Sequence, residues 1–160
     1  MEPEFVAIKK FLDSLHVPYV HYEHEPVHTS GDAARVRGVE LKTGVKALLF
    51  KSGPQFILVL VPGDRRADFQ KLRALTGENN IRMATAEEVF KVTNCEIGSV
   101  HPFGNLMGIQ TFMEKAILAN EKVNFNAGLH TVTISMNSRN LKDAVKPVLC
   151  DIAKDRHDQL

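Results

Sequence analysis

Val45-Lys-Ala-Leu-Leu-Phe-Lys51 and Phe56-Ile-Leu-Val-Leu-Val61 are two apolar runs that flank the turn Ser52-Gly-Pro-Gln55. Two runs of this length around a Gly-Pro turn predict an antiparallel strand–turn–strand unit, with strands over residues 45–51 and 56–61. The second run is apolar at every position from Ile57 to Val61, so we expect other elements to cover both faces of that strand.

Helical and strand patterns continue on both sides of this hairpin. Apolar spacing and end signals predict helices over residues 3–16, 32–37, 68–75, 85–92 and 138–155, and strands over 19–22, 81–84, 108–112, 123–126 and 131–136. Thr29 and Ser30 can cap the second helix, and Pro147 must kink or split the last one. Strands in pairs with inserted helices predict one α+β domain over residues 1–160 on a mixed sheet.

Composition limits the class of protein. The chain has 160 residues, a formal net charge of +1, 44% hydrophobic and 24% charged residues, which are ordinary values for a globular domain. This charge argues against binding to nucleic acid by bulk electrostatics but allows a local basic patch. There is no apolar run of roughly 20 residues to span a membrane, and the N-terminus lacks the pattern of a secretory signal. With two distant cysteines, Cys95 and Cys150, we expect a reduced, cytoplasmic protein.

The segment Gly98-Ser-Val-His-Pro-Phe-Gly104 is too rich in glycine and proline for a helix or a central strand. It therefore predicts a loop of fixed shape, which can direct backbone N–H groups at a carbonyl or phosphate oxygen in a pocket. The alternative is a tight connection between two strands. His101 within it faces either the substrate or the solvent.

Several polar side chains are candidates for chemistry. Lys46 lies in an apolar strand, either as a fixed cation aimed into a cleft or as an edge lysine whose head reaches water. His130 is either a donor to substrate or a turn residue. The spacing of His21, His24 and His28 does not suit a metal site, so we expect His24 and His28 in a polar pocket wall and His21 at the surface.

The two cysteines are poor candidates for a nucleophile. Cys150 occupies a helical position among apolar residues, which predicts a core side chain. No feature of the sequence would stabilise a thiolate at Cys95.

An ordered set of motifs resembles the YbaK and prolyl-tRNA-synthetase-associated editing domains, which are free-standing aminoacyl-tRNA deacylases. The matching segments are Tyr22-Glu-His24, Thr29, Lys46-Ala-Leu-Leu49, Val61-Pro-Gly63 before Asp68-Phe-Gln-Lys-Leu72, Gly98 to Gly104, and Phe125-Asn-Ala-Gly128. They occur in the family order and cover about residues 15–145.

This resemblance implies a mixed, mostly antiparallel, barrel-like sheet surrounded by helices, with a pocket between the lysine strand and the glycine loop. It also implies hydrolysis of the ester between a wrong amino acid and the end of a tRNA, without a metal or other cofactor. Lys46 and Gly98 are then the catalytic positions, and a ribose hydroxyl of the substrate is the proton acceptor. Substrate contacts are expected from His24, His28, Thr29, Ser99, Val100, His101, Pro102, Gly104, Gly128 and His130.

Three positions depart from the family pattern: Ala47, Ser99 and Glu114. They bear on which amino acid and which tRNA are edited, with a tRNA for proline or a similar tRNA carrying a small wrong amino acid as the expected substrate. The expected partners are the acceptor end of aminoacyl-tRNA and an aminoacyl-tRNA synthetase, and no membrane. Two alternatives stay open: a non-catalytic module that binds the tRNA end on a synthetase, and a small-molecule esterase that uses the same pocket.

Overall fold

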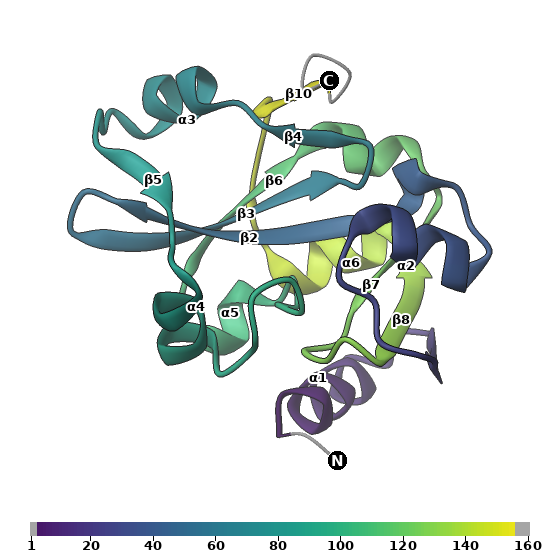
Figure 1. The fold of residues 1–160 in the computed structure, drawn as a ribbon. Helices are drawn as coiled ribbons and strands as arrows, with labels where there is room; N and C mark the ends of the chain where they lie inside the picture. Colours follow the sequence, from purple (N-terminus) through teal and green to yellow (C-terminus); the bar gives the residue numbers. More distant parts are fainter. Residues whose placement is uncertain (1–2, 156–160) are drawn as a thin grey trace.

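The computed structural model describes residues 3–155, and a mixed five-stranded sheet lies at its centre (Figure 1). Its strand order is β5 (Ile81–Met83), β2 (Val45–Ser52), β3 (Gln55–Pro62), β6 (Gln110–Glu114) and β9 (Val148–Cys150). β2 and β3 pair antiparallel over their whole length, as predicted, whereas β6 runs parallel to β3 and β9 runs parallel to β6.

Strand β3 is covered on both faces, which confirms the expectation from its unbroken apolar run. Leu58 and Leu60 belong to the larger hydrophobic cluster, which includes Phe5 and Ile8 of the first helix. Ile57, Val59 and Val61 point the other way, into a second cluster. Because successive side chains of a strand alternate between faces, one strand contributes to both hydrophobic cores.

Two smaller sheets complete the strand set. β8 (Val132–Asn137) pairs antiparallel with both β1 (Tyr19–Glu23) and β7 (Lys122–Asn126). β4 (Arg65–Ala67) pairs with β10 (Ala153–Asp155). The predicted α+β class is confirmed; in the described part of the chain the strands form three sheets and do not close into a barrel.

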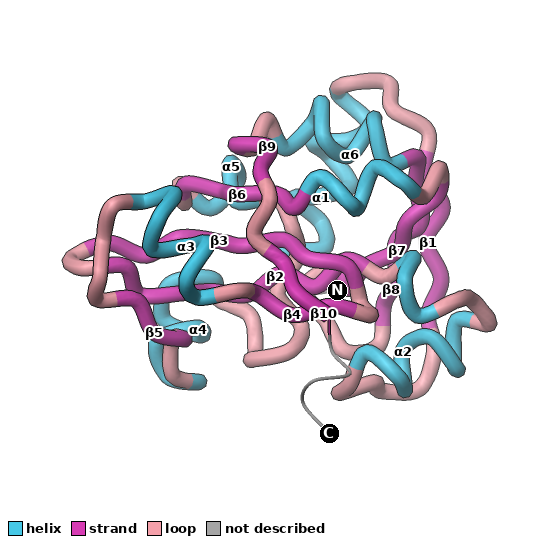
Figure 2. Tube along the Cα trace, turned by 90° about the horizontal axis from the view of Figure 1, so that it is seen from above, coloured by secondary structure: helices cyan, strands magenta, loops and turns pink. Residues whose placement is uncertain are grey.

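The helices surround these sheets (Figure 2). They are α1 (Pro3–Ser14), α2 (Ser30–Arg37), α3 (Phe69–Thr76), α4 (Ala86–Thr93), α5 (Gly104–Met107) and α6 (Ser138–Val145), with 3₁₀ turns η1 (Leu41–Thr43) and η2 (Lys115–Ala119). The end signals hold: the Thr29 hydroxyl accepts the Asp32 N–H, and Gly38 ends α2 in the left-handed conformation with φ of 67°. Within residues 3–155 no helix is long and apolar enough to cross a membrane.

The predicted helix over residues 138–155 is wrong beyond Val145. Lys146 ends α6 in the left-handed conformation, with φ of 53°. Pro147 disfavours a helical conformation in the residue before it and has no N–H for the helix. The chain then adds β9 and β10 to two sheets. Cys150 therefore lies in an edge strand and is partly exposed, not in a helix core.

Three further details differ from the sequence-based expectation. The side chain that caps α6 is Asn137, which accepts the N–H groups of Arg139 and Asn140, and not Ser138. The strand expected over residues 108–112 begins at Gln110, because Gly108 ends α5 with a positive φ. The three-residue strand β4 and the four-residue helix α5 are too short to produce a period in the sequence.

Candidate functional site

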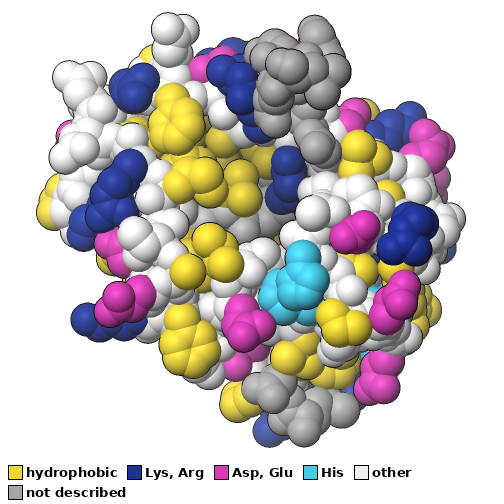
Figure 3. Space-filling view, in the orientation of Figure 1, with side chains coloured by type: hydrophobic (Ala, Val, Ile, Leu, Met, Phe, Trp, Pro, Cys, Tyr) yellow, Lys and Arg dark blue, Asp and Glu magenta, His cyan; other side chains and the backbone are white. Residues whose placement is uncertain are grey.

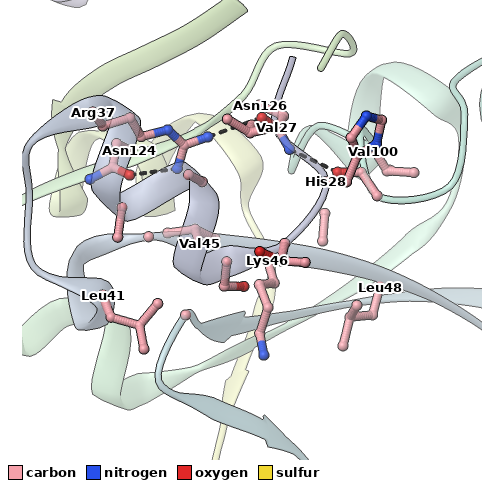
Figure 4. Close-up of a pocket in the computed structure, with 18 of the residues that line it drawn as sticks. Val27, His28, Arg37, Leu41, Val45, Lys46, Leu48, Val100, Asn124 and Asn126 are labelled. Atoms are coloured by element: carbon pink, nitrogen blue, oxygen red, sulfur yellow. Dashed lines mark hydrogen bonds between the residues drawn. The ribbon is translucent and has the colours of Figure 1, made fainter. Parts of the chain in front are cut away.

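A cavity of about 200 Å³ lies between α2, the start of β2, β7 and the glycine loop. It brings together five of the predicted catalytic and substrate-contacting residues: His28, Thr29, Lys46, Gly98 and Val100. Figure 4 shows Lys46 and Arg37 at different ends of this group of side chains. On the face seen in Figure 1, hydrophobic side chains gather around a hollow with basic and histidine side chains beside it (Figure 3).

The other predicted contact residues do not line this cavity. Ser99 is buried, and its hydroxyl donates to the Glu96 carbonyl at 2.8 Å. His101 is only 2% exposed. Gly104 opens α5 at a point where any side chain would collide with Thr111. Pro102 is buried in the same loop. These residues form the inner side of the loop.

Gly98 requires glycine. Its φ is +87°, where side chains are rarely tolerated. A Cβ there would meet the His130 ring at 3.5 Å and the His28 carbonyl oxygen at 3.8 Å, both ordinary contacts, so the backbone angle rather than space excludes larger residues. The Asn126 amide donates to the Gly98 carbonyl at 2.8 Å, which fixes the orientation of this peptide at the cavity wall.

His130 ties two loops together beside the cavity. Its Nδ1 donates to the Val27 carbonyl at 2.8 Å, because a carbonyl can only accept. Its Nε2 lies 3.4 Å from the Glu96 carboxylate, and its ring lies 4.4 Å from the His28 ring. His130 therefore holds the loop before α2 next to the loop that contains Gly98, and is not itself part of the cavity lining.

Lys46 is partly buried in β2, opposite Val61 of β3. Its ammonium donates to the Arg65 carbonyl at the start of β4. Lys46 thus belongs to the cavity wall, and Figure 4 shows its side chain directed away from Arg37, with the ammonium held in place at the Arg65 carbonyl.

Arg37 is the main cavity residue that the sequence did not indicate. It ends α2, and its side chain donates to Thr133 Oγ1 at 2.8 Å. It also donates to Asn124 Oδ1 at 2.7 Å and Asn126 Oδ1 at 3.0 Å (Figure 4). Burial lowers the pKa of this guanidinium to about 10. Asn124 and Asn126 share one face of β7, while Val123 and Phe125 face the core. That alternation of Asn with apolar residues was the available signal for a polar wall.

The network extends beyond the cavity to His24. Its Nδ1 donates to the Glu25 carbonyl at 2.7 Å, so in the neutral ring Nε2 accepts the hydroxyl proton of Thr133, also at 2.7 Å. The Thr133 oxygen in turn accepts from Arg37. His24 therefore contacts Arg37 only through Thr133. Gly128 is buried near Cys95 and His101, and its φ is +85°.

The described residues contain no group of three or more His, Cys, Asp or Glu side chains placed to hold a metal. His21 packs its ring edge-on against Phe5, 5.2 Å between ring centres. Burial raises the pKa of both cysteine thiols, Cys95 and Cys150, to about 11. A thiol with so high a pKa is a poor nucleophile at neutral pH.

Two of the three departures from the family pattern lie outside the cavity. Ala47 lines it. Ser99 is buried on the inner side of the glycine loop. Glu114 is 1% exposed, and its carboxylate accepts the N–H groups of Ala116, Ile152 and Ala153. Glu114 thereby fixes the C-terminal strands to the main sheet.

The model of the aminoacyl-tRNA editing domain family matches residues 24–144. The proline–tRNA ligase of Thermosipho melanesiensis is 35% identical over 100 residues, which are 59% of this chain and 18% of the ligase. The chain therefore spans less than a fifth of that relative.

Two solved structures share the fold over nearly their whole length. The crystal structure of the hypothetical protein APE2540 has a TM-score of 0.85 at 23% identity, covering 92% of this chain and 99% of that one. A protein described as a candidate trans-editing enzyme for prolyl tRNA synthetase has a TM-score of 0.83 at 25% identity, covering 96% and 99%.

Proposed function

We propose that this chain, which belongs to the aminoacyl-tRNA editing domain family, hydrolyses the ester between a wrong amino acid and the 3′ end of a tRNA, acting in trans. The observation that carries the proposal is the cavity between Lys46 and Gly98, within a segment that matches the family model. The likeness to a candidate trans-editing enzyme and to a region of proline–tRNA ligases supports a tRNA for proline as the substrate.

The chemistry suits a site without a protein nucleophile. An aminoacyl ester is activated, so its hydrolysis needs a positioned water, donors for the developing oxyanion and a pocket that excludes other substrates. In the proposed mechanism the rigid backbone at Gly98 supplies N–H groups to the ester carbonyl. Within residues 3–155 neither the Gly98 nor the Val100 N–H donates to a protein acceptor. As the water attacks, the neighbouring ribose hydroxyl of the substrate takes up the water proton and passes its own proton to the ribose oxygen that leaves when the ester bond breaks.

Lys46 has an electrostatic role in this proposal. Its ammonium is held by the Arg65 carbonyl and does not need to move on binding. A fixed cation at the wall stabilises the negative charge that develops on the ester in the transition state. His28, Thr29 and Ala47 line the space that the amino acid and terminal ribose would occupy.

The test is deacylation of a panel of mischarged tRNAs, beginning with alanyl- and cysteinyl-tRNA for proline. We expect wild-type hydrolysis of at least one of them and a loss of about 100-fold or more for Lys46→Ala, the range seen when an oxyanion-stabilising group is removed. Lys51→Ala, on the same strand but outside the cavity, should retain wild-type turnover.

Wild-type turnover by a folded Lys46→Ala variant would make Lys46 a structural lysine. Binding of the tRNA without hydrolysis of any member of the panel would instead identify a non-catalytic tRNA-end module. Hydrolysis of simple esters alone would identify a small-molecule esterase.

A further inference from the structure

Arg37 presents a positive charge to the cavity without a negative partner in the described chain. All three of its side-chain acceptors are neutral: one threonine hydroxyl and two asparagine carbonyls. Among residues 3–155, no carboxylate lies within salt-bridge distance of its guanidinium. The neighbouring Arg35, on the exposed side of the same helix, pairs instead with Glu25 and Asp32.

A structural role does not account for this charge. Hydrogen bonds to hydroxyl and amide oxygens can be made by neutral donors, whereas desolvating a cation is unfavourable unless an anion compensates. A guanidinium has five N–H donors, and three of them are used by Thr133, Asn124 and Asn126. Arg37 belongs to the cavity lining, and these three bonds fix the orientation of its guanidinium.

We propose that the Arg37 end of the cavity is an anion subsite that takes a phosphate group of a nucleotide. Guanidinium donors match the oxygens of a phosphate, which makes arginine well suited to bind it. This inference rests on the proposed function, in which the anion is the phosphate on the 5′ side of the terminal nucleotide of the tRNA. An aminoacyl ester has no free carboxylate, and its α-ammonium group would be repelled by Arg37.

This assignment orients the substrate. Because Arg37 and Lys46 lie at different ends of the site (Figure 4), the phosphate at Arg37 leaves Lys46 and Gly98 for the ester. The Asn126 amide contacts both Arg37 and the Gly98 carbonyl, at 3.0 and 2.8 Å. The phosphate subsite is therefore linked directly to the loop that would hold the ester carbonyl.

The experiment measures equilibrium binding of adenosine 5′-monophosphate, adenosine and inorganic phosphate to the full chain by calorimetry. Wild type should bind the monophosphate about 10- to 100-fold more tightly than adenosine, the range expected for charge-assisted hydrogen bonds. Arg37→Gln should remove that preference and leave adenosine binding unchanged. Arg37→Lys should retain part of it, since the charge stays but the planar donor group is lost.

Arg35→Gln is the matched control, because it removes the same charge from an exposed position on the same helix. It should bind the monophosphate as wild type does. Thermal unfolding of each variant reports whether it is folded. Should Arg37→Gln not fold, the wild-type ratio and Arg37→Lys still decide the question.

Equal wild-type affinity for adenosine and its monophosphate would overturn the subsite, as would an unchanged preference in folded Arg37→Gln. Tight binding of inorganic phosphate that is lost in Arg37→Gln, with no added affinity for the nucleotide, would also overturn a nucleotide-phosphate site. None of these binding results bears on whether the wild-type protein deacylates mischarged tRNA, so they would contradict the subsite and not the proposed function. Conversely, an Arg37-dependent preference in a protein that hydrolyses no mischarged tRNA supports the subsite and contradicts only the proposed function.

Discussion

His101 should make the stability of the protein depend on pH between about 4 and 6.5. The side chain is 2% exposed, and its Nδ1 accepts the N–H of Phe103 at 3.2 Å. Burial lowers the pKa of His101 from its usual 6.5 to about 4. A proton on Nδ1 would both remove this hydrogen bond and place a charge in the core.

The sign and size of the effect follow from proton linkage. Below pH 6.5 the unfolded chain binds a proton at His101, whereas the folded chain binds it only near pH 4. The contribution to the free energy of unfolding is therefore complete above pH 6.5, declines as the pH falls, and is lost below about 4. The two pKa values differ by about 2.5, and each pKa unit is worth about 1.4 kcal/mol, so the total is about 3 kcal/mol.

The assay is urea unfolding at intervals from pH 4 to pH 7.5, comparing wild type with His101→Asn. The variant should be less stable at pH 7.5, and the gap should narrow by about 3 kcal/mol towards pH 4. Val100→Ala is the control, because it removes packing from the same loop without removing a titrating group, and its curve should run parallel to wild type. Parallel curves for wild type and His101→Asn would refute the assignment of a buried neutral histidine.

Four other changes test the site by single-turnover deacylation. Gly98→Val should lower kcat by about 100-fold or more with near-normal tRNA affinity, because valine is strained at φ of +87°; unchanged hydrolysis in a folded variant would leave the loop a simple connection. Pro102→Ala should also lower kcat, but by less than Gly98→Val does, because it loosens the loop without adding bulk. A larger fall in kcat for Pro102→Ala than for Gly98→Val would contradict this expectation. Asn126→Ala frees the Gly98 carbonyl and should lower kcat by about 5-fold, since a hydrogen bond contributes about 1 kcal/mol; a change in KM alone would argue against a positioning role for Asn126. Cys95→Ser with Cys150→Ser, and treatment with EDTA, should leave the rate at the wild-type level, whereas loss that zinc restores would overturn the mechanism.

Local patterns were sufficient for most of the elements. The hairpin β2–β3 and the capped helices α2 and α4 depend on neighbouring residues alone: an apolar run, a turn dipeptide, a cap at each end. The same is true of the segment from Gly98 to Pro102, whose glycine and proline content predicted a loop. For such features the relevant energies are short-range, and a sequence window contains all the atoms that decide them.

Long-range packing decided the rest. Nothing near Pro147 in the sequence shows that Val148 to Cys150 joins β6 as a parallel strand, because the partner lies 36 residues earlier in each pair. Arg37 was missed for the same reason: its three acceptors lie 87 to 96 residues away in the chain. The sequence by itself determined the α+β class and the residues of the glycine loop. Only the tertiary structure decided that Arg37 and Lys46 share one cavity with Gly98, because the chain segments meet only when the sheets pack.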